Sequence, residues 1–209
     1  MADKKIDGFA QSYSLTSLDH TKALYADWSS NYDEQLSDTG YITPERCAAA
    51  LASFSTDKSA PVLDFGCGTG LSAAALRDAG FTTIDGTDLS AEMIAVAETK
   101  QLYRQLWVSE ADTSLAFATG TYAAITAVGV FTPGHAPGRV MAQIMDRLAP
   151  GGLFVFSFND HSMEDPDLTE ALADLCAQPF VAIRHDEYGD HLPGIDLKAK
   201  IYVLERTDG

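Results

Sequence analysis

The sequence predicts an α/β protein whose core is a doubly wound, mostly parallel sheet of seven strands. Apolar strand-like runs alternate with helix signals over residues 62–176, which is typical of parallel strands joined by crossover helices. The last two strand-like runs, at 180–185 and 197–205, have no helix between them, so we expect an antiparallel hairpin. Two helical segments precede the first strand. We therefore expect an N-terminal helical cap over residues 1–58 and a sheet domain over residues 59–209.

Helix signals are clear before the first strand. Residues 18–35 carry aromatic and apolar side chains at spacings near three and four, which is typical of one buried helix face. Thr43 is the expected N-cap of a second helix, with Pro44 at its first position and an end near residue 54.

The chain then alternates between strands and helices. After a strand at about 62–65, a helix begins at Leu71 and ends before Gly80, which stands where C-terminal glycines are common. Ser90 is expected to cap the next helix, and a polar loop that includes Gly189 is expected to join the hairpin strands. The other expected elements are strands at 81–90, 102–108, 122–131 and 153–158, and helices at 91–99, 139–148 and 165–176.

The turn after the first strand is the most informative stretch of the chain. Asp64 stands at the end of the strand, and Gly66, Gly68 and Gly70 follow at alternate positions before the helix begins. Without Cβ atoms the backbone can bend tightly and approach a ligand, and the free N–H groups of the helix point back at the turn. A carboxylate there suits a ligand with polar groups and positive charge better than a bare phosphate.

Composition narrows the range of partners. The 209 residues include 30 acidic and 14 basic ones, a formal net charge of −16, and such a surface repels the phosphate backbone of nucleic acids. No apolar run reaches the ~18 residues needed to cross a bilayer, and no secretory signal is visible. Cys47, Cys67 and Cys176 lack the spacing of a metal site or a disulfide framework. We expect a cytoplasmic protein without nucleic-acid, membrane or metal partners, in an oligomeric state that the sequence does not indicate.

Two interpretations of the glycine turn compete. Residues 68–73 fit G-x-G-x-x-A, and Asp88 follows 20 residues after Gly68, which is also the fingerprint of a dinucleotide-binding oxidoreductase. Asp64 argues against that interpretation, because a carboxylate before the glycines would repel a pyrophosphate. The antiparallel hairpin is likewise foreign to the usual nicotinamide-binding sheet.

Taken together, the motifs resemble those of the class I S-adenosylmethionine (SAM) dependent methyltransferases. Residues 64–70 read acid-x-G-x-G-x-G, residues 86–93 read G-x-D-x-S-x-x-M, and a Pro-Gly-Gly turn at 150–152 precedes the fifth strand. The resemblance implies a Rossmann-like fold, SAM as cofactor and methyltransferase activity (EC 2.1.1.-). Residues 25–33 and 40–44 look like the tyrosine-rich start of small-molecule members. With residues 129–135 they are similar to the Williams–Beuren-region methyltransferase-like group, which implies a small-molecule acceptor.

The resemblance assigns roles around SAM. Asp88 is expected to accept both ribose hydroxyls, and Asp64 to favour the ammonium end of the cofactor or to fix the turn by accepting backbone N–H bonds. Cys67 is expected to be a small packed side chain, whereas Met93 and the tyrosines fit either the cofactor or the core. The expected cofactor-binding residues are Tyr25, Tyr32, Asp64, Gly66, Cys67, Gly68, Gly70, Asp88, Leu89, Met93 and Asp112.

The acceptor side offers one catalytic candidate. His135 follows the fourth strand, at the carboxyl end of the sheet where ligands bind, and an ordinary histidine pKa suits proton abstraction. His161 is a lesser candidate by the same argument. The leading hypothesis is methyl transfer from SAM to a small molecule. An NAD(P)-dependent oxidoreductase and a SAM-binding protein without transferase activity are the alternatives, and the sequence identifies neither the acceptor nor the methylated atom.

Overall fold

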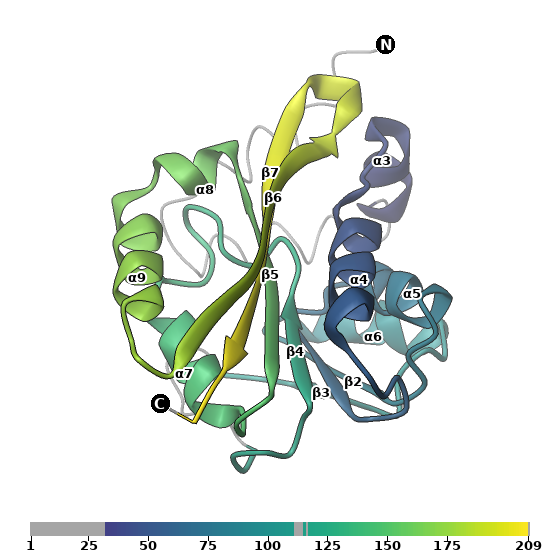
Figure 1. Cartoon of the computed structure of the whole chain (residues 1–209). Coiled ribbons are helices and arrows are strands. Elements are labelled where there is room, and N and C mark those ends of the chain that lie inside the picture. Colours follow the sequence, from purple (N-terminus) through teal and green to yellow (C-terminus); the bar gives the residue numbers. More distant parts are fainter. Residues whose placement is uncertain (1–31, 111–114, 116, 209) are drawn as a thin grey trace.

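A seven-stranded sheet runs through the computed structural model of the chain, which describes residues 32–110, 115 and 117–208 (Figure 1). The strands are β1 (Val62–Phe65), β2 (Ile84–Asp88), β3 (Gln105–Val108), β4 (Ala124–Ala127), β5 (Leu153–Asn159), β6 (Val181–Leu192) and β7 (Leu197–Arg206). Their spatial order is β3-β2-β1-β4-β5-β7-β6.

The sheet is parallel from β3 to β5 and ends in an antiparallel hairpin. Val62 of β1 pairs with Ile84 of β2 and with Ala124 of β4, so the carboxyl ends of these three strands meet at one edge. β7 pairs in antiparallel fashion with β5 and with β6. The predicted seven-stranded, mostly parallel sheet with its C-terminal hairpin is therefore confirmed.

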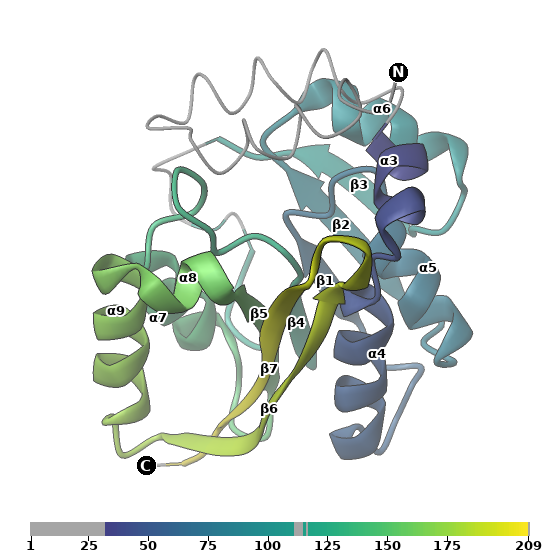
Figure 2. The same cartoon turned by 90° about the horizontal axis from the view of Figure 1, so that it is seen from above.

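Helices cover both faces of the sheet. They are α3 (Tyr32–Thr39), α4 (Thr43–Phe54), α5 (Leu71–Asp78), α6 (Ala91–Thr99), α7 (Arg139–Arg147), α8 (Asp160–Glu164) and α9 (Pro166–Cys176), and a 3₁₀ turn, η1 (Pro193–Ile195), joins β6 to β7. Figure 2 shows α4, α5 and α6 on one side of the sheet and α7, α8 and α9 on the other. α3 lies beside the tip of the hairpin, where a Cβ on Gly194 would come within 3.0 Å of the Thr39 carbonyl oxygen.

Apolar side chains fill both layers. Toward α7 and α9, the rings of Phe154 and Phe156 stack with centroids 4.7 Å apart, within a larger buried cluster. Toward α4 and α5, Leu51 and Leu76 are buried against the sheet. Each such side chain contributes about 1.5–3 kcal/mol relative to exposure. α4 thus contributes to the main core, and the domain boundary at residue 58 stays a prediction.

The N-terminal helices differ from the prediction in one cap. The segment expected at 18–35 lies mostly outside the described residues, and α3 spans Tyr32–Thr39. Thr43 is the first residue of α4 and not its N-cap, so that prediction is wrong. The N-cap is Ile42, which makes no side-chain cap bond, and Oγ1 of Thr43 instead lies 2.6 Å from Nδ1 of buried His191. A tertiary hydrogen bond therefore replaces the local one.

Three of the parallel strands, β2, β3 and β4, are shorter than predicted. β4 ends at Ala127 rather than residue 131, because Gly129 turns the chain with φ +70°. β2 and β3 begin at Ile84 and Gln105, later than expected. The short helix α8, capped by Asn159, was not predicted.

The outer hairpin strand is longer than predicted. β6 continues through Gly189, which was expected in a loop. A Cβ on Gly189 would lie 3.0 Å from Nη2 of Arg46 in α4. The Arg46 guanidinium donates to the carbonyl oxygens of Glu187, Asp190 and Ala199 at 2.7–3.0 Å. Gly189 therefore makes room for a cation that holds the hairpin to α4.

Candidate functional site

The glycine turn between β1 and α5 lies at the carboxyl edge of the sheet. Gly66, Gly68 and Gly70 have φ of +70°, +52° and +93°, a backbone region that favours glycine. A Cβ on Gly66 would collide with Cγ2 of Val130 at 2.5 Å, and one on Gly70 would lie 3.2 Å from Cε2 of Tyr103. Around Gly68 no atom of the described residues lies within 4 Å of that position. Of the three, only Gly68 is therefore unobstructed by the described residues.

Asp88 joins this open point from the end of β2. Its Oδ2 accepts the Gly68 N–H at 2.9 Å, and its Oδ1 accepts the Ser90 N–H at 2.9 Å. Burial raises the pKa of Asp88, and the backbone N–H bonds oppose that rise. Each carboxylate oxygen has a further lone pair, so the side chain can also accept a pair of hydroxyls. The predicted ribose acid thus stands beside the one open glycine.

Asp64 lies behind the turn, fully buried. Its carboxylate accepts hydroxyl bonds from Ser72 of α5 at 2.5 Å, Tyr103 at 2.8 Å and Thr126 of β4 at 3.2 Å. Burial raises the pKa of Asp64 to about 6, and these hydroxyls oppose the rise. The partners are side-chain hydroxyls rather than the backbone N–H groups that the sequence suggested.

Of the remaining predicted cofactor residues, some have side chains that the structure describes and the others do not. Cys67 is buried, and burial strongly raises the pKa of its thiol, so a thiolate nucleophile is disfavoured. Leu89 is half-buried after β2, and Met93 is buried in α6, where its N–H donates to the Ser90 cap. Tyr25 and Asp112 lie outside the described residues, and Tyr32 begins α3 with a side chain that also lies outside the description.

Two contacts at the turn were not predicted. Asp33 of α3 accepts a bond from Oγ1 of Thr69 and forms an ion pair with Lys100, each at 2.5 Å. Tyr103, just before β3, reaches Asp64 with its hydroxyl. Asp33 ends the family-like stretch 25–33, where no role was predicted for it, and Tyr103 belongs to no motif; each lies more than thirty positions from its partner. A sequence signal for them is therefore lacking.

His135 lies in a loop that is held at both ends. Ser162 Oγ donates to the Phe131 carbonyl oxygen at 2.7 Å, and the Gly138 N–H donates to Asp167 at 2.7 Å. Nδ1 of His135 is 3.2 Å from the Pro133 carbonyl oxygen, and burial lowers the pKa of its imidazole. A neutral imidazole in a fixed loop at the carboxyl edge can accept a proton.

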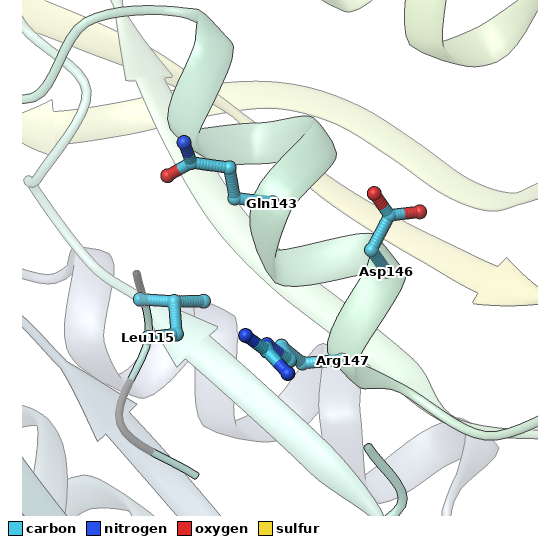
Figure 3. Close-up of a pocket in the computed structure, with 4 residues that line it drawn as sticks. All are labelled: Leu115, Gln143, Asp146 and Arg147. Carbon is cyan, nitrogen blue, oxygen red and sulfur yellow. The ribbon is translucent and has the colours of Figure 1, made fainter. Parts of the chain in front are cut away.

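A separate shallow hollow lies on α7, away from the glycine turn. Leu115, Gln143, Asp146 and Arg147 line it, and its volume is about 190 Å³ (Figure 3). Arg147 ends α7, which returns from the carboxyl end of β4 toward the start of β5, so the hollow faces the opposite end of the sheet. Over the described part of the chain, no helix is long and apolar enough to span a bilayer, and no group of three His, Cys, Asp or Glu suits a metal ion.

Comparison with known proteins identifies the family. A family profile described as a methyltransferase domain matches residues 38–200. The chain belongs to the class I SAM-dependent methyltransferases. Human methyltransferase-like protein 27 is 29% identical over 160 residues, which cover 74% of this chain and 65% of the human protein. The chain thus spans less than two thirds of that relative's length.

Solved methyltransferases share the fold. A chain from the complex between the Haloferax volcanii Trm112 methyltransferase activator and a methyltransferase superposes with a TM-score of 0.69 at 17% identity, covering 90% of this chain and 98% of its own. Magnesium protoporphyrin IX methyltransferase from Synechocystis PCC 6803, solved with bound SAM, gives 0.60 at 18% identity, covering 84% and 83%. The cofactor of this methyltransferase family is SAM, which decides against the dinucleotide interpretation. The open Gly68, the adjoining Asp88 and the start of α5 fit its ribose and methionine portions.

Proposed function

We propose that this chain transfers a methyl group from SAM to a small-molecule acceptor. The observation that carries the proposal is the bond between Asp88 and Gly68 at the open point of the glycine turn. A carboxylate, an uncluttered backbone and the N-terminus of α5 lie together there. These groups suit the hydroxyls of a ribose and the polar end of an amino acid.

The predicted residues divide the cofactor among them. Asp88 accepts the ribose hydroxyls, the backbone around Gly68 follows the methionine portion, and Asp64 supplies negative charge from behind the turn. Asp64 is fully buried and bonded to three hydroxyls, which favours action through the field rather than direct contact. Leu89, Met93 and Asp112 are proposed near the adenine, and Tyr25 and Tyr32 near the methionine tail.

The chain's own contribution to chemistry is placement and proton transfer. SAM, when bound, would supply a methyl group on a sulfonium cation, with S-adenosylhomocysteine as the leaving group when an acceptor attacks the methyl carbon in line. Such a reaction mainly needs the two reactants held collinear and water excluded. His135 is the proposed base for an acceptor that carries a proton on its nucleophilic atom. Its lowered pKa keeps the imidazole neutral at pH 7, and the bonds from Ser162 and Asp167 hold its loop.

The charge of the chain and one structural neighbour favour a small acceptor. The net charge of −16 disfavours RNA and DNA. The Synechocystis neighbour is named for a magnesium protoporphyrin, which is a small molecule. We also propose a cytoplasmic location, because the three cysteines are all unpaired.

Calorimetric titration with SAM and S-adenosylhomocysteine tests the cofactor half. We expect wild-type protein to bind both, and Asp88→Ala to weaken each by at least about tenfold, because hydrogen bonds to a charged group are worth ~1.5–3 kcal/mol. Glu170→Gln, an exposed change on α9, is the matched control and should bind as wild type. Absence of binding by the wild type, or an unchanged Asp88→Ala, would overturn the assignment.

Transfer of radiolabelled methyl groups to a metabolite extract tests the acceptor half. We expect His135→Gln to lower the rate about 10²-fold with unchanged SAM affinity, as for loss of a general base. His185→Gln, in the hairpin, is the control. Because the Haloferax neighbour was solved with an activator, binding without transfer calls for a repeat with a Trm112-type protein. Continued inactivity would favour a non-catalytic SAM-binding protein.

A further inference from the structure

We propose that Tyr103 is a positioning residue of the cofactor site. Its ring packs against the glycine turn, and its hydroxyl donates to Asp64, which lies behind the turn. The inference rests on the proposed function of that turn. Tyr103 lies between α6 and β3, belongs to none of the motifs, and packs half-buried against the same face of the sheet as α5.

The ring explains two glycines. A Cβ on Gly86, in the middle of β2, would lie 2.7 Å from Cε1 and 2.9 Å from Cδ1 of Tyr103, and also 2.7 Å from Cδ2 of Leu106. A Cβ on Gly70, at the end of the turn, would lie 3.2 Å from Cε2 of the same ring. Real Cβ contacts are almost never as short as those at Gly86, and Gly86 has no positive φ that would require glycine. At Gly70 the φ of +93° already favours glycine, and the ring adds a tight contact. The ring therefore occupies space that both glycines vacate, and it links β2 to the turn.

The hydroxyl completes the contact. It donates to Oδ2 of Asp64 at 2.8 Å, the oxygen that also accepts from Ser72 of α5. Asp64 lies in β1 before the turn and Ser72 lies in α5 after it, so Tyr103 links both sides through one carboxylate. Loss of this donor leaves a buried carboxylate with two hydroxyls, which favours its neutral form.

The groups that face Asp64 define how its charge behaves. Cys47 of α4, Cys67 of the turn, Asp88 of β2 and Tyr103 all interact with it electrostatically, and none is a cation. Its other partners, Ser72 of α5 and Thr126 of β4, are neutral hydroxyls. Among the described residues no ion pair involves Asp64. A bound cation would supply the counter-charge that the described residues do not give Asp64.

The backbone of Tyr103 is fixed on both sides. Arg77 of α5 donates from Nε and Nη2 to the Leu102 carbonyl oxygen at 2.9 and 2.5 Å. The Arg104 N–H donates to the Ile84 carbonyl oxygen at 2.7 Å. A side chain mounted between two anchored neighbours can transmit its position to the turn.

The test compares two tyrosines that each donate to a buried carboxylate. Tyr103→Phe removes the bond to Asp64, and Tyr122→Phe removes a 2.9 Å bond to Asp85. We measure the dissociation constants of SAM and S-adenosylhomocysteine by calorimetry between pH 5.5 and 8. We expect Tyr103→Phe to weaken SAM about tenfold and to move the midpoint of the pH profile upward, with Tyr122→Phe unchanged in both. Equal losses in the two variants, or an unchanged Tyr103→Phe, would overturn the proposal.

A second measurement needs no cofactor. Gly86→Ala should speed amide exchange in the turn by forcing the Tyr103 ring aside. Tyr103→Leu in the same chain should remove the part of that effect that passes through the ring, while the 2.7 Å collision with Cδ2 of Leu106 remains. Additive effects of the two substitutions would contradict the claim that Gly86→Ala acts on the turn through the Tyr103 ring. Failure of wild-type protein to bind SAM would count against the proposed function alone, since this exchange experiment judges Tyr103 independently.

Discussion

Asp64 and Asp85 are two buried carboxylates on neighbouring strands, and they are satisfied in opposite ways. Asp85 of β2 pairs with Leu63 of β1 in the sheet, one position from Asp64. Arg104 grips Asp85 with two bonds at 2.9 and 2.6 Å, and the Tyr122 hydroxyl adds a third. Asp64 has three hydroxyls and, in the described part of the chain, no cation.

The difference separates a structural charge from a functional one. A buried charge is costly unless it is paired and hydrogen-bonded. Asp85 obtains its pair from the same chain, so its charge serves the fold. Asp64 keeps its charge without a pair, at the edge where a cationic cofactor is proposed to bind. A carboxylate whose pKa burial raises to about 6, in such a place, is a candidate for function.

Removal of the Asp85 counter-charge should give the largest effect. We expect Arg104→Met to lower the free energy of unfolding more than Asp64→Asn does, because it leaves the buried Asp85 carboxylate without its cation. Solvent moderates the loss, since the Arg104 side chain is 48% exposed. Urea unfolding measures the loss, and calorimetry should show unchanged SAM affinity. A stable variant, or one that loses SAM affinity while folded, would remove the contrast.

Neutralising Asp64 should show the reverse pattern. We expect Asp64→Asn to weaken SAM at least about tenfold, equivalent to ~1.4 kcal/mol, while the free energy of unfolding changes by less. The matched control is Asp85→Asn, which should lose stability and keep its SAM affinity. If both variants behave alike, the two carboxylates do not differ in role.

Titration of ligand-free protein sharpens the comparison. The raised pKa of Asp64 means that its protonation stabilises the folded protein fully below about pH 3.8 and that this contribution is lost as pH rises through about 6. The unfolding free energy of wild type minus Asp64→Asn should therefore grow as pH falls from 7.5 to 4.5, on the order of 1–2 kcal/mol.

The test compares wild type with Asp64→Asn because His191 has the opposite effect on how the unfolding free energy depends on pH. Burial lowers the pKa of His191 to about 4, so its contribution to stability is lost as pH falls from about 6.5 toward 4. His191→Gln should reduce that acid-side loss. A flat difference between wild type and Asp64→Asn would contradict the assigned pKa.

The smallest effect is expected at the longest of the three hydroxyl bonds. Thr126 lies 3.2 Å from Asp64, against 2.5 Å for Ser72. We expect Thr126→Val to weaken SAM about two- to threefold and Ser72→Ala more, since one hydrogen bond contributes ~0.5–1.5 kcal/mol. If calorimetry gave the opposite ranking, the lengths of these bonds would not determine how far each hydroxyl stabilises the charged form of Asp64.

Local pattern was enough for the fold. The strand–turn–helix order, the Ser90 cap and the hairpin all follow from residues that act on their neighbours, and each is present. The strand ends were harder to predict from the sequence. Gly129 ends β4 by its positive φ, and Gly189 stays in β6 because it lies against Arg46, which is far away along the chain.

The parts of the candidate site that could be predicted are those that follow from a local motif and from the sheet topology. Asp88 and the turn stand at one edge because parallel strands end together. The packing reasons for Gly66 and Gly70 were hidden, since they depend on Val130 and Tyr103. Asp33 and Tyr103 were missed because their partners lie 36 and 39 residues away, and no local spacing encodes such contacts.

The most direct test of the Asp64 charge is the number of protons released when SAM binds. Calorimetry at pH 6 in buffers of different ionisation enthalpy measures it. With a pKa of about 6, Asp64 is half protonated, so binding of a cation should release up to about half a proton from wild type and none from Asp64→Asn. Equal proton release from both proteins would show that the protonation state of Asp64 does not change when the cationic cofactor binds.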